Sequence, residues 1–428
     1  MERRNHLILL FISTILLFPY LLSADTIRMM HYNLLYYTEN GVDDCTSSNN
    51  NLDLKDAAFK SIVKSICPDV LTVNEIGKGS VYAQRVLDRV LNTDGVSYFA
   101  YIPAEANASI SIGNGFFYDS RKLALKDKFY ISTSVGYFNA FRMYYRSEQL
   151  AQGDTVYVTF IVTHLKAGNS SSNATTRYQQ TMQLMNRLRT LGEGNYVLSG
   201  DLNIYNASEN AYQNLVHNSN ALLRFYDPIN REGEWDNNPD FADIFTQSTH
   251  ADNSSTCHSS GGMDNRFDFI LVSGNVMNGS TGIRCLPNTY KAYGQDGLRW
   301  NQSINNPTNT IVSAGIANAL YTMSDHLPVV MDFVVDANVS VTEQEISRYI
   351  HINNPVTDRL TVWTELPQTE PLTFEIYTAD GRLLSRQARE TAAGRTETHL
   401  EFPYRPAIYF LKITGSKGNF AVKKFIKQ

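Results

Sequence analysis

Two short motifs place acidic, amide and imidazole side chains beside apolar runs that predict strands. Asp201 and Asn203 directly follow one such run, and Asp325 and His326 directly precede another. Alternation along a strand would point Asp201 and Asn203 to the same side, although an Asx turn would explain the pair equally well. Carboxylate and amide oxygens bind hard divalent cations, and an imidazole exchanges a proton near neutral pH. The two motifs together suggest metal-assisted hydrolysis of a phosphate ester.

Two further oxygen-bearing side chains stand at predicted strand ends. Asn33 closes the apolar run 27–34, and Glu75 follows the run 70–74. If these strands are neighbours, an amide oxygen and a carboxylate meet at one sheet edge and suit Mg²⁺, Mn²⁺ or Ca²⁺ better than zinc. A turn-forming Asn33 and a surface Glu75 are the alternatives.

A histidine and a buried carboxylate complete the candidate set. His164 follows the apolar run 156–163, and Asp268 lies inside the apolar run 267–272. A carboxylate within such a strand is costly unless it is paired. We therefore expect Asp268 to accept a hydrogen bond from one ring nitrogen of His326 and to fix its tautomer. A structural histidine at either position is the alternative.

Four basic residues are candidate phosphate contacts, and ordinary solvated charge is the alternative for each: Arg142, Arg146, Lys166 and Arg177. The net charge is −5, so the chain lacks the strong positive charge typical of a protein that binds nucleic acid by counterion release. It does not argue against an enzyme that must release its product.

The N-terminus predicts export. Residues 1–24 form a short basic start, the apolar run 7–22 and a small Ser23-Ala24 pair, which is typical of a signal peptide. A retained signal anchor is the alternative, and no later apolar stretch is long enough to span a bilayer.

The four cysteines of an exported chain allow three pairings. We favour Cys45 with Cys67 and Cys257 with Cys285 because each pair is close in sequence, and free thiols are the alternative. Their spacing does not indicate a zinc site.

The chain of 428 residues predicts one large and one small domain. Residues 25–336 alternate apolar strand-like runs with polar loops and a few helical segments, which favours an α+β protein with stacked sheets. Besides the runs named above, strands are expected at 97–101, 115–118, 196–199 and 329–334, and helices at 54–66, 79–91 and 177–191.

The order of these motifs, from Thr26 to Asp336, resembles the endonuclease/exonuclease/phosphatase superfamily, which includes deoxyribonuclease I. The resemblance implies a four-layer α/β sandwich, with two stacked mixed sheets flanked by helices. It implies that Asn33 and Glu75 hold a divalent metal, Mg²⁺ or else Mn²⁺ or Ca²⁺, and that Asp325 joins the metal or water network. One metal or two remain open.

The same resemblance implies catalytic roles. His164 would contact the scissile phosphate, Asp201 would position or deprotonate the attacking water, and Asn203 would donate to the phosphate. His326, oriented by Asp268, would act as general base or stabilise the transition state. The chain departs from the family in having Asn74 before Glu75, where Gln is commoner.

The motifs do not separate the branches of the superfamily. The run 163–168 looks more like secreted nuclease-like members, so we expect an endonuclease acting on extracellular nucleic acid. A sphingomyelinase or phospholipase C-type enzyme acting on phospholipid is one alternative, and Phe138–Tyr145 is the nearest candidate for a membrane-inserting aromatic hairpin. A non-catalytic surface adhesin is the other alternative.

A polar linker at 337–347 leads to a strand-rich tail at 348–428, with strands expected at 360–363, 372–377, 407–413 and 420–426 and a hairpin turn at Asp380-Gly381. The tail resembles the C-terminal sorting domain of the type IX secretion system of Bacteroidetes, through its segments 354–356, 376–382, 407–411 and 423–426. We therefore expect a monomer that is secreted or held at the outer cell surface by this machinery. A small β-sandwich that binds carbohydrate or a partner is the alternative.

Overall fold

The computed structural model describes residues 25–39, 41–106, 111–146, 155–221, 223–335, 350–366, 369–415 and 420–428. The predicted signal peptide at 1–24 and linker at 337–347 lie outside the described residues. Within them, no helix is both long and apolar enough to cross a membrane.

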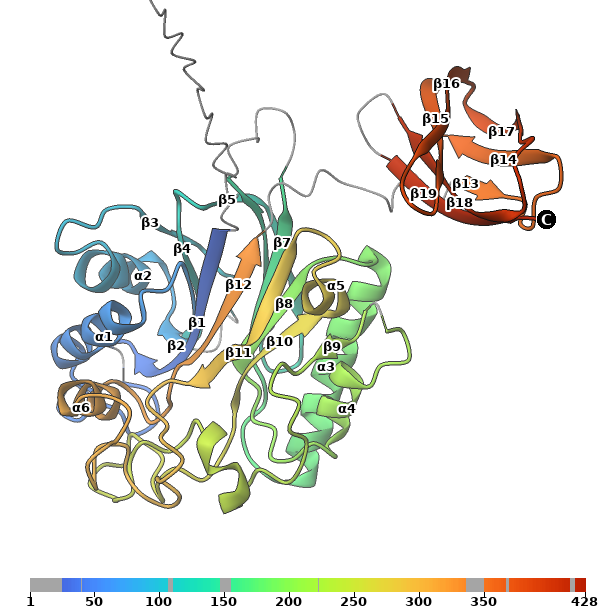
Figure 1. Cartoon of the computed structure of the whole chain (residues 1–428). Coiled ribbons are helices and arrows are strands. Elements are labelled where there is room, and N and C mark those ends of the chain that lie inside the picture. Colours follow the sequence, from blue (N-terminus) through green and yellow to red (C-terminus); the bar gives the residue numbers. More distant parts are fainter. Residues whose placement is uncertain are drawn as a thin grey trace, which may run out of the picture.

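Two six-stranded mixed sheets form the large domain (Figure 1). The first sheet has the order β11 (Ile283–Ala292), β12 (Val329–Val335), β1 (Asp25–Tyr37), β2 (Val70–Gly77), β4 (Ile112–Asp119), β3 (Phe99–Ile102). The second sheet has the order β5 (Leu123–Ser132), β6 (Tyr137–Tyr145), β7 (Tyr157–His164), β8 (Tyr196–Asp201), β10 (Asp268–Ser273), β9 (Phe225–Tyr226).

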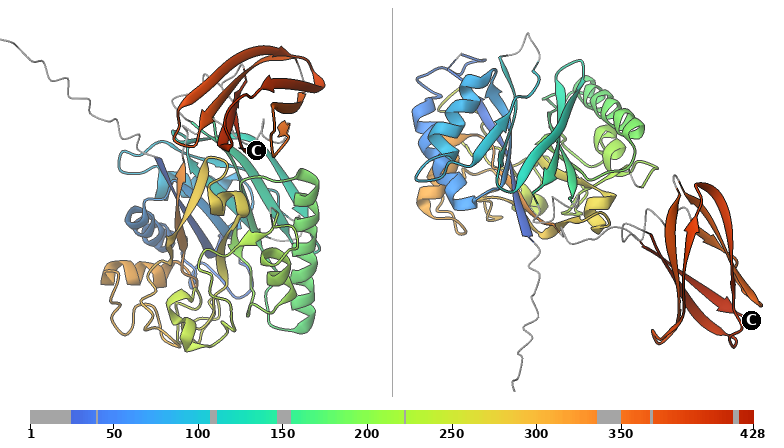
Figure 2. Two further views of the ribbon diagram at one scale, coloured as in Figure 1. Left: turned by 45° about the vertical axis from the view of Figure 1, so that its right-hand side comes forward. Right: turned by 90° about the horizontal axis from the view of Figure 1, so that it is seen from above.

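Helices cover the outer faces of both sheets (Figure 2). The first sheet carries α1 (Leu52–Ile66), α2 (Ser80–Val86) and α6 (Ala314–Met323), and the second carries α3 (Ser171–Leu191) and α4 (Asn210–Val216). The shorter elements are the π-helix Leu87–Leu91, the 3-10 helix Pro239–Ile244 and α5 (Gly274–Asn278). The predicted four-layer sandwich is confirmed.

Strand alternation explains why the sheets stack. In β1, Ile27 and Met29 point into the core between the sheets, whereas Met30 and Tyr32 point to the core beneath the helices. Such two-sided burial is the pattern expected of a strand packed on both faces. Phe116 and Phe141 stack across the seam between the sheets with their ring centroids 4.6 Å apart.

The expected strands from 27–34 to 329–334 all correspond to strands of the two sheets, but β5, β6, β9 and β11 were not predicted. The segment Phe138–Tyr145 is not a hairpin that could enter a membrane. It lies in β6, paired with β5 on one side and β7 on the other, and its Phe138, Phe141 and Met143 side chains are buried.

The predicted disulfide pairing is wrong. Cys45 is bonded to Cys257, 212 positions away, with their Cα atoms 4.5 Å apart. Cys67 is an exposed free thiol at the end of α1, and Cys285 is a buried free thiol. Closeness in sequence misled the prediction, because the sheet topology brings the loops that follow β1 and precede β10 to the same edge.

The C-terminal strands form two antiparallel sheets that share one apolar core. One sheet contains β13 (Ile350–Ile352), β14 (Arg359–Leu366) and β17 (Gly394–Glu401), and the other has the order β16 (Leu383–Thr391), β15 (Glu370–Thr378), β18 (Ala407–Thr414), β19 (Phe420–Lys427). The predicted hairpin is confirmed, since β15 pairs with β16 and Gly381 adopts φ 84° in the turn. A small β-sandwich results.

Candidate metal centre and active site

The chemistry-bearing side chains meet at one edge of the sandwich because of strand direction. β1 runs parallel to β2, and β7 runs parallel to β8, so the carboxyl ends of all four strands point the same way. β10 and β12 run antiparallel to β8 and β1, so their first residues lie at that same edge. In the second sheet, His164 is the register partner of Asp201, which is in turn the partner of Asp268.

Side-chain alternation also aims these groups into the seam. Asp201 and Asp268 have the parity of Val197 and Ile270, which face the first sheet. Glu75 has the opposite parity to its neighbour Asn74. However, β2 changes register between Val73 and Ile76, and Glu75 adopts a left-handed φ of 58°. This irregularity allows the Glu75 carboxylate to reach the seam.

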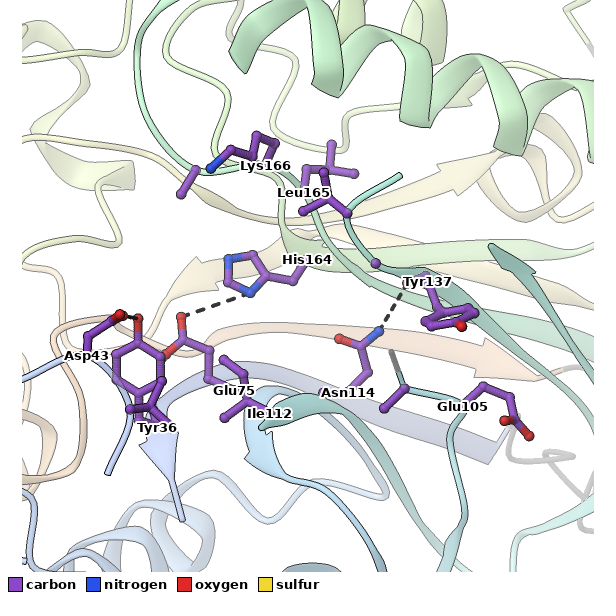
Figure 3. Close-up of a pocket in the computed structure, with 16 residues that line it drawn as sticks. Tyr36, Asp43, Glu75, Glu105, Ile112, Asn114, Tyr137, His164, Leu165 and Lys166 are labelled. Atoms are coloured by element: carbon purple, nitrogen blue, oxygen red, sulfur yellow. Dashed lines mark hydrogen bonds and ion pairs between the residues drawn. The ribbon is translucent and has the colours of Figure 1, made fainter. Parts of the chain in front are cut away.

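Glu75, His164 and Asp201 offer ligand atoms that all lie within 4.8 Å of one another. His164 Nε2 lies 3.4 Å from Asp201 Oδ2, and His164 Nδ1 lies 4.0 Å from Glu75 Oε1 (Figure 3). Burial raises the pKa of both carboxyl groups. Two buried carboxylates and an imidazole in this space fit a divalent cation, because such an ion would stabilise their charged forms.

Asn33 clamps the two carboxylates. Its amide nitrogen donates to Glu75 Oε1 at 3.0 Å and to Asp201 Oδ2 at 3.1 Å, which joins the two sheets. Its amide oxygen accepts from the backbone N–H of Leu35. In this structure the amide nitrogen of Asn33 orients the two carboxylates. That Asn33 is a metal ligand stays a prediction, and Asp201 and His164 lie beside Glu75 in the cluster.

Asp325 lies beside this cluster with one oxygen engaged and one free. Its Oδ2 accepts from the Ser259 N–H at 2.9 Å and from Gln247 Nε2 at 3.3 Å. Its Oδ1 is buried and has no partner among the described residues. Ser324 fixes the loop by donating to the carbonyl of Asn33 at 2.7 Å. The free oxygen is consistent with the predicted place of Asp325 in a metal or water network.

The predicted hydrogen bond between Asp268 and His326 is present. Asp268 Oδ2 lies 2.7 Å from His326 Nδ1, and both side chains are buried. On the other side of the ring, Gln247 Nε2 lies 2.7 Å from His326 Nε2, and Asp201 Oδ2 lies 3.7 Å away. Burial opposes the charged imidazolium, but the carboxylates of Asp268 and Asp201 outweigh it and raise the pKa of His326 well above its usual value. The surroundings of His326 therefore stabilise its imidazolium form.

Asp201 and Asn203 form an Asx turn, which the sequence offered as the alternative to strand alternation. β8 ends at Asp201, Asn203 adopts φ 50°, and its N–H donates to Asp201 Oδ1 at 3.0 Å. Its amide donates to the carbonyl of Leu165 at 3.3 Å, next to His164. The turn keeps Asn203 beside the site, but strand alternation is not the reason.

Of the four basic residues, the structure brings only Lys166 to the site. A cavity of about 370 Å³ is lined by Lys166, His164 and Glu75 together with Tyr36 and Tyr137 (Figure 3). The backbone of Lys166 is fixed by a hydrogen bond from its N–H to the side chain of Gln180.

The three arginines have other partners. Arg177 is buried, with its guanidinium bonded to Glu209 and to the carbonyls of Lys166 and Gly168, so it braces the loop that carries Lys166. Arg142 faces Thr159 in the sheet, five residues before His164 along β7, and lies 3.6 Å from Asp127. Arg146 follows β6, still farther from that edge, and donates to the Leu123 carbonyl.

Several site residues had no clear signal in the sequence. Gln247 contacts both Asp325 and His326 from a loop. Asn74 was noted only as a departure from the family, yet its side-chain oxygen accepts from the Asp201 N–H at 2.8 Å across the seam. His31 lies buried behind Asp268, with its Nε2 atom 3.7 Å from Asp268 Oδ1. Its position in an apolar strand next to a candidate ligand was the only available hint.

No model of a known protein family matches the sequence, and no curated protein matches it. Several solved structures are similar. An endonuclease/exonuclease/phosphatase family protein from Bacteroides thetaiotaomicron has 14% sequence identity and a TM-score of 0.46, over 73% of this chain and 99% of that chain. TDP2 of D. rerio, complexed with a single-strand DNA product, has 13% identity and a TM-score of 0.45, over 72% and 98%. The human Nocturnin catalytic domain with a bound sulfate anion has 14% identity and a TM-score of 0.45, over 73% and 97%.

Proposed function

We propose that the chain is a divalent-metal-dependent hydrolase of phosphoric esters. One observation supports this above all: the cluster Glu75, His164 and Asp201 adjoins the hydrogen-bonded pair Asp268 and His326 at a single edge. Phosphoester hydrolysis needs charge stabilisation at the phosphate together with a group that accepts a proton from water. The edge offers both within one seam.

His326 is the proposed general base or stabiliser of the transition state. Its raised pKa favours the imidazolium, whose Nδ1–H donates to Asp268 and whose Nε2 faces Gln247 and the Asp201 carboxylate. In the neutral ring, Nε2 can accept a proton. Asp268 holds the ring and stabilises the imidazolium that forms when Nε2 takes a proton from the attacking water. A contribution of about 10²- to 10⁴-fold is typical of such a positioned base.

Glu75 and Asp201 are the carboxylates that would hold the metal, with Asp325 near by, and the His164 ring lies beside them. A bound Mg²⁺, or Mn²⁺ or Ca²⁺, supplies Lewis-acid stabilisation of the phosphoryl oxygens and lowers the pKa of coordinated water. The contribution of the chain is orientation: Asn33 holds both carboxylates, and Asn74 holds the backbone of Asp201.

His164 and Lys166 are the proposed phosphate contacts. The His164 side chain is 26% exposed and lies in the wall of the cavity, so it can meet a substrate. From there a ring N–H of His164 can donate to the leaving oxygen, and the Lys166 ammonium can pair with a phosphate oxygen. Figure 3 shows His164 between Lys166 and Glu75.

The proposed substrate is nucleic acid, cleaved as an endonuclease would. Support comes from the nuclease-like run 163–168, which carries both His164 and Lys166. The displacement of Arg142, Arg146 and Arg177 from the site leaves a small basic footprint, so few phosphates beyond the scissile one are held. Weak salt dependence is therefore expected. No structural observation favours the phospholipid alternative, because Phe138–Tyr145 is an internal strand.

The test is to incubate the purified chain with plasmid DNA, RNA and sphingomyelin liposomes, with Mg²⁺ or with EDTA, beside His326→Ala. Metal-dependent cleavage of DNA or RNA that His326→Ala loses is the expected result. Cleavage of liposomes alone would transfer the proposal to the phospholipid branch. Activity on none of the three, in wild type and variant alike, would reject the nuclease hypothesis and favour the adhesin.

Export also remains a proposal. We infer that residues 1–24 are a signal peptide and that the tail 348–428 directs the chain through a type IX secretion system to the outer surface or the medium. Expression in a host with this system, with and without residues 348–428, tests it by cell fractionation. Retention of the shortened chain in the periplasm is expected, and equal release of both forms would contradict the proposal.

A further inference from the structure

A buried histidine faces the free oxygen of the Asp268 carboxylate. His31 lies in β1 of the first sheet and is fully buried, as is Asp268 in β10 of the second sheet. Its Nε2 atom lies 3.7 Å from Asp268 Oδ1, and both atoms lack a hydrogen-bond partner among the described residues. The other carboxylate oxygen, Oδ2, is bonded to His326. Asp268 is therefore placed between two imidazoles from different strands.

The rear of the His31 ring is anchored by hydroxyl groups. His31 Nδ1 lies 3.0 Å from Thr72 Oγ1 in β2, and Thr72 Oγ1 lies 2.9 Å from Ser199 Oγ in β8. A consistent direction runs through this chain: Ser199 donates to Thr72, Thr72 donates to Nδ1, and Nε2–H points at Asp268. Every donor in this arrangement meets an acceptor.

The reverse direction is unfavourable. If Nδ1 carried the proton and donated to Thr72, the lone pair of Nε2 would face the buried carboxylate oxygen of Asp268. Both acceptors would then be buried without a donor, and each such group costs about 1–3 kcal/mol. A doubly protonated ring would again place an N–H opposite Asp268. Nε2 therefore carries a proton whether the ring is neutral or doubly protonated.

We propose that His31 is a positioning residue, whose Nε2–H holds the Oδ1 atom of Asp268 so that Oδ2 stays aimed at Nδ1 of His326. The separation of 3.7 Å exceeds hydrogen-bond length, and a small rotation of either side chain closes it. The pair that orients the base thereby becomes a relay of three groups. Its far end is fixed to the first sheet through Thr72.

The first test needs neither substrate nor a working variant. Nitrogen-15 NMR of histidine-labelled wild-type protein reports which ring nitrogen of His31 carries the proton, with assignment by the signal that His31→Gln removes. A protonated Nε2 is expected. A His31 ring protonated only at Nδ1 would overturn the inference.

The second test rests on the proposed function and uses two matched variants. In His31→Gln the amide nitrogen reaches the place of Nε2, whereas in His31→Asn the shorter amide reaches only the place of Nδ1. We expect His31→Asn to lower kcat by about tenfold or more at unchanged KM, as loss of an outer-shell partner does. His31→Gln should recover most of the lost turnover.

Equal kcat in wild type, His31→Asn and His31→Gln would sink the positioning role, as would an equal loss in both variants. If wild-type protein cleaves no phosphoric ester, the proposed function fails, while the protonation of His31 still decides the hydrogen bond. The two failures are thus distinguishable.

Discussion

His326 Nδ1 lies 2.7 Å from Asp268 Oδ2, although the two residues are 58 positions apart in the chain, His326 in the loop before β12 and Asp268 at the start of β10. We expect Asp268→Asn to lower kcat by about 10²-fold or more, because an amide can stabilise neither the tautomer nor the charge of the imidazole. The variant is isosteric, so its far-UV circular dichroism should be unchanged. Steady-state kinetics measure the effect. An unchanged kcat in Asp268→Asn would show that Asp268 has no part in the mechanism.

Metal binding should stabilise the chain through Glu75 and Asp201. At a free Mg²⁺ concentration of 100 times Kd, the free energy of unfolding should rise by about 2.7 kcal/mol, since the ion binds only the folded state. Glu75→Gln and Asp201→Asn should abolish this gain, and the exposed Glu234→Gln should keep it. Urea titrations with and without Mg²⁺ measure the effect, and an equal gain in all three variants would place the ion elsewhere.

Two residues predicted as phosphate contacts should behave differently. Lys166→Ala should raise KM by about tenfold, the loss of one charge-assisted hydrogen bond of roughly 1.5 kcal/mol, at unchanged stability. Arg177→Ala should instead lower the free energy of unfolding by about 3–5 kcal/mol, because Glu209 would remain buried without its partner. Denaturant melts and kinetics on both variants separate the cases, and a stable Arg177→Ala with raised KM would reverse the assignment.

Replacing a cysteine of the Cys45–Cys257 disulfide should lower the stability of the fold far more than replacing a free cysteine. It closes a loop of 212 positions, and the chain-entropy description gives a stabilisation of about 5 kcal/mol, above the usual range of about 2–4. Cys45→Ser should therefore be strongly destabilising, whereas Cys67→Ser, at an exposed free thiol, should not. Non-reducing peptide mapping should recover the Cys45–Cys257 cross-link, and a Cys45–Cys67 peptide would contradict the structure.

His250 should make the chain sensitive to acid. It lies between the rings of His258 and Tyr321, and burial, aided by the charge of His258, lowers its pKa to about 4. An unfolded histidine has a pKa of about 6.5. The unfolded chain thus binds more protons between these values, and stability falls as the pH drops from about 6.5 to about 4, by up to about 1.4 kcal/mol per pH unit.

His250→Phe keeps the ring stack and cannot bind the proton. The advantage of wild type over this variant should shrink steadily across that pH window in urea titrations. A difference that stays constant with pH would show that His250 does not carry the effect.

The sequence predicted the strands that are buried on both faces far better than those at the rim. β10 is apolar from Phe269 to Val272, and Asp332 is the one polar residue of β12. In contrast, β5 carries Lys126, Asp127 and Lys128 on exposed positions and β11 contains Pro287. Such strands are edge strands, where charge and proline are tolerated, and their pattern is that of a loop. Tertiary packing, not local preference, makes them strands.

The site was predictable wherever a polar residue ended an apolar run. Arg177 is not a phosphate contact in this structure because it lies on the buried face of its helix with Gln180, Leu184 and Leu188, whereas Met182 on the other face is 40% exposed. The contacts of Gln247 and the donor role of Asn33 could not be predicted. They depend on how loops and sheets lie in space, and the spacing of residues along the sequence does not determine this.

The residues of the candidate site are divided between the two sheets. Glu75 belongs to the first sheet and His164, Asp201 and Asp268 to the second, so neither half holds a complete site. A nascent or partly folded polypeptide has no reactive centre, however much secondary structure it has formed. The proposed hydrolytic site is therefore complete only where the two sheets are packed together, and a chain in which they have not packed lacks it.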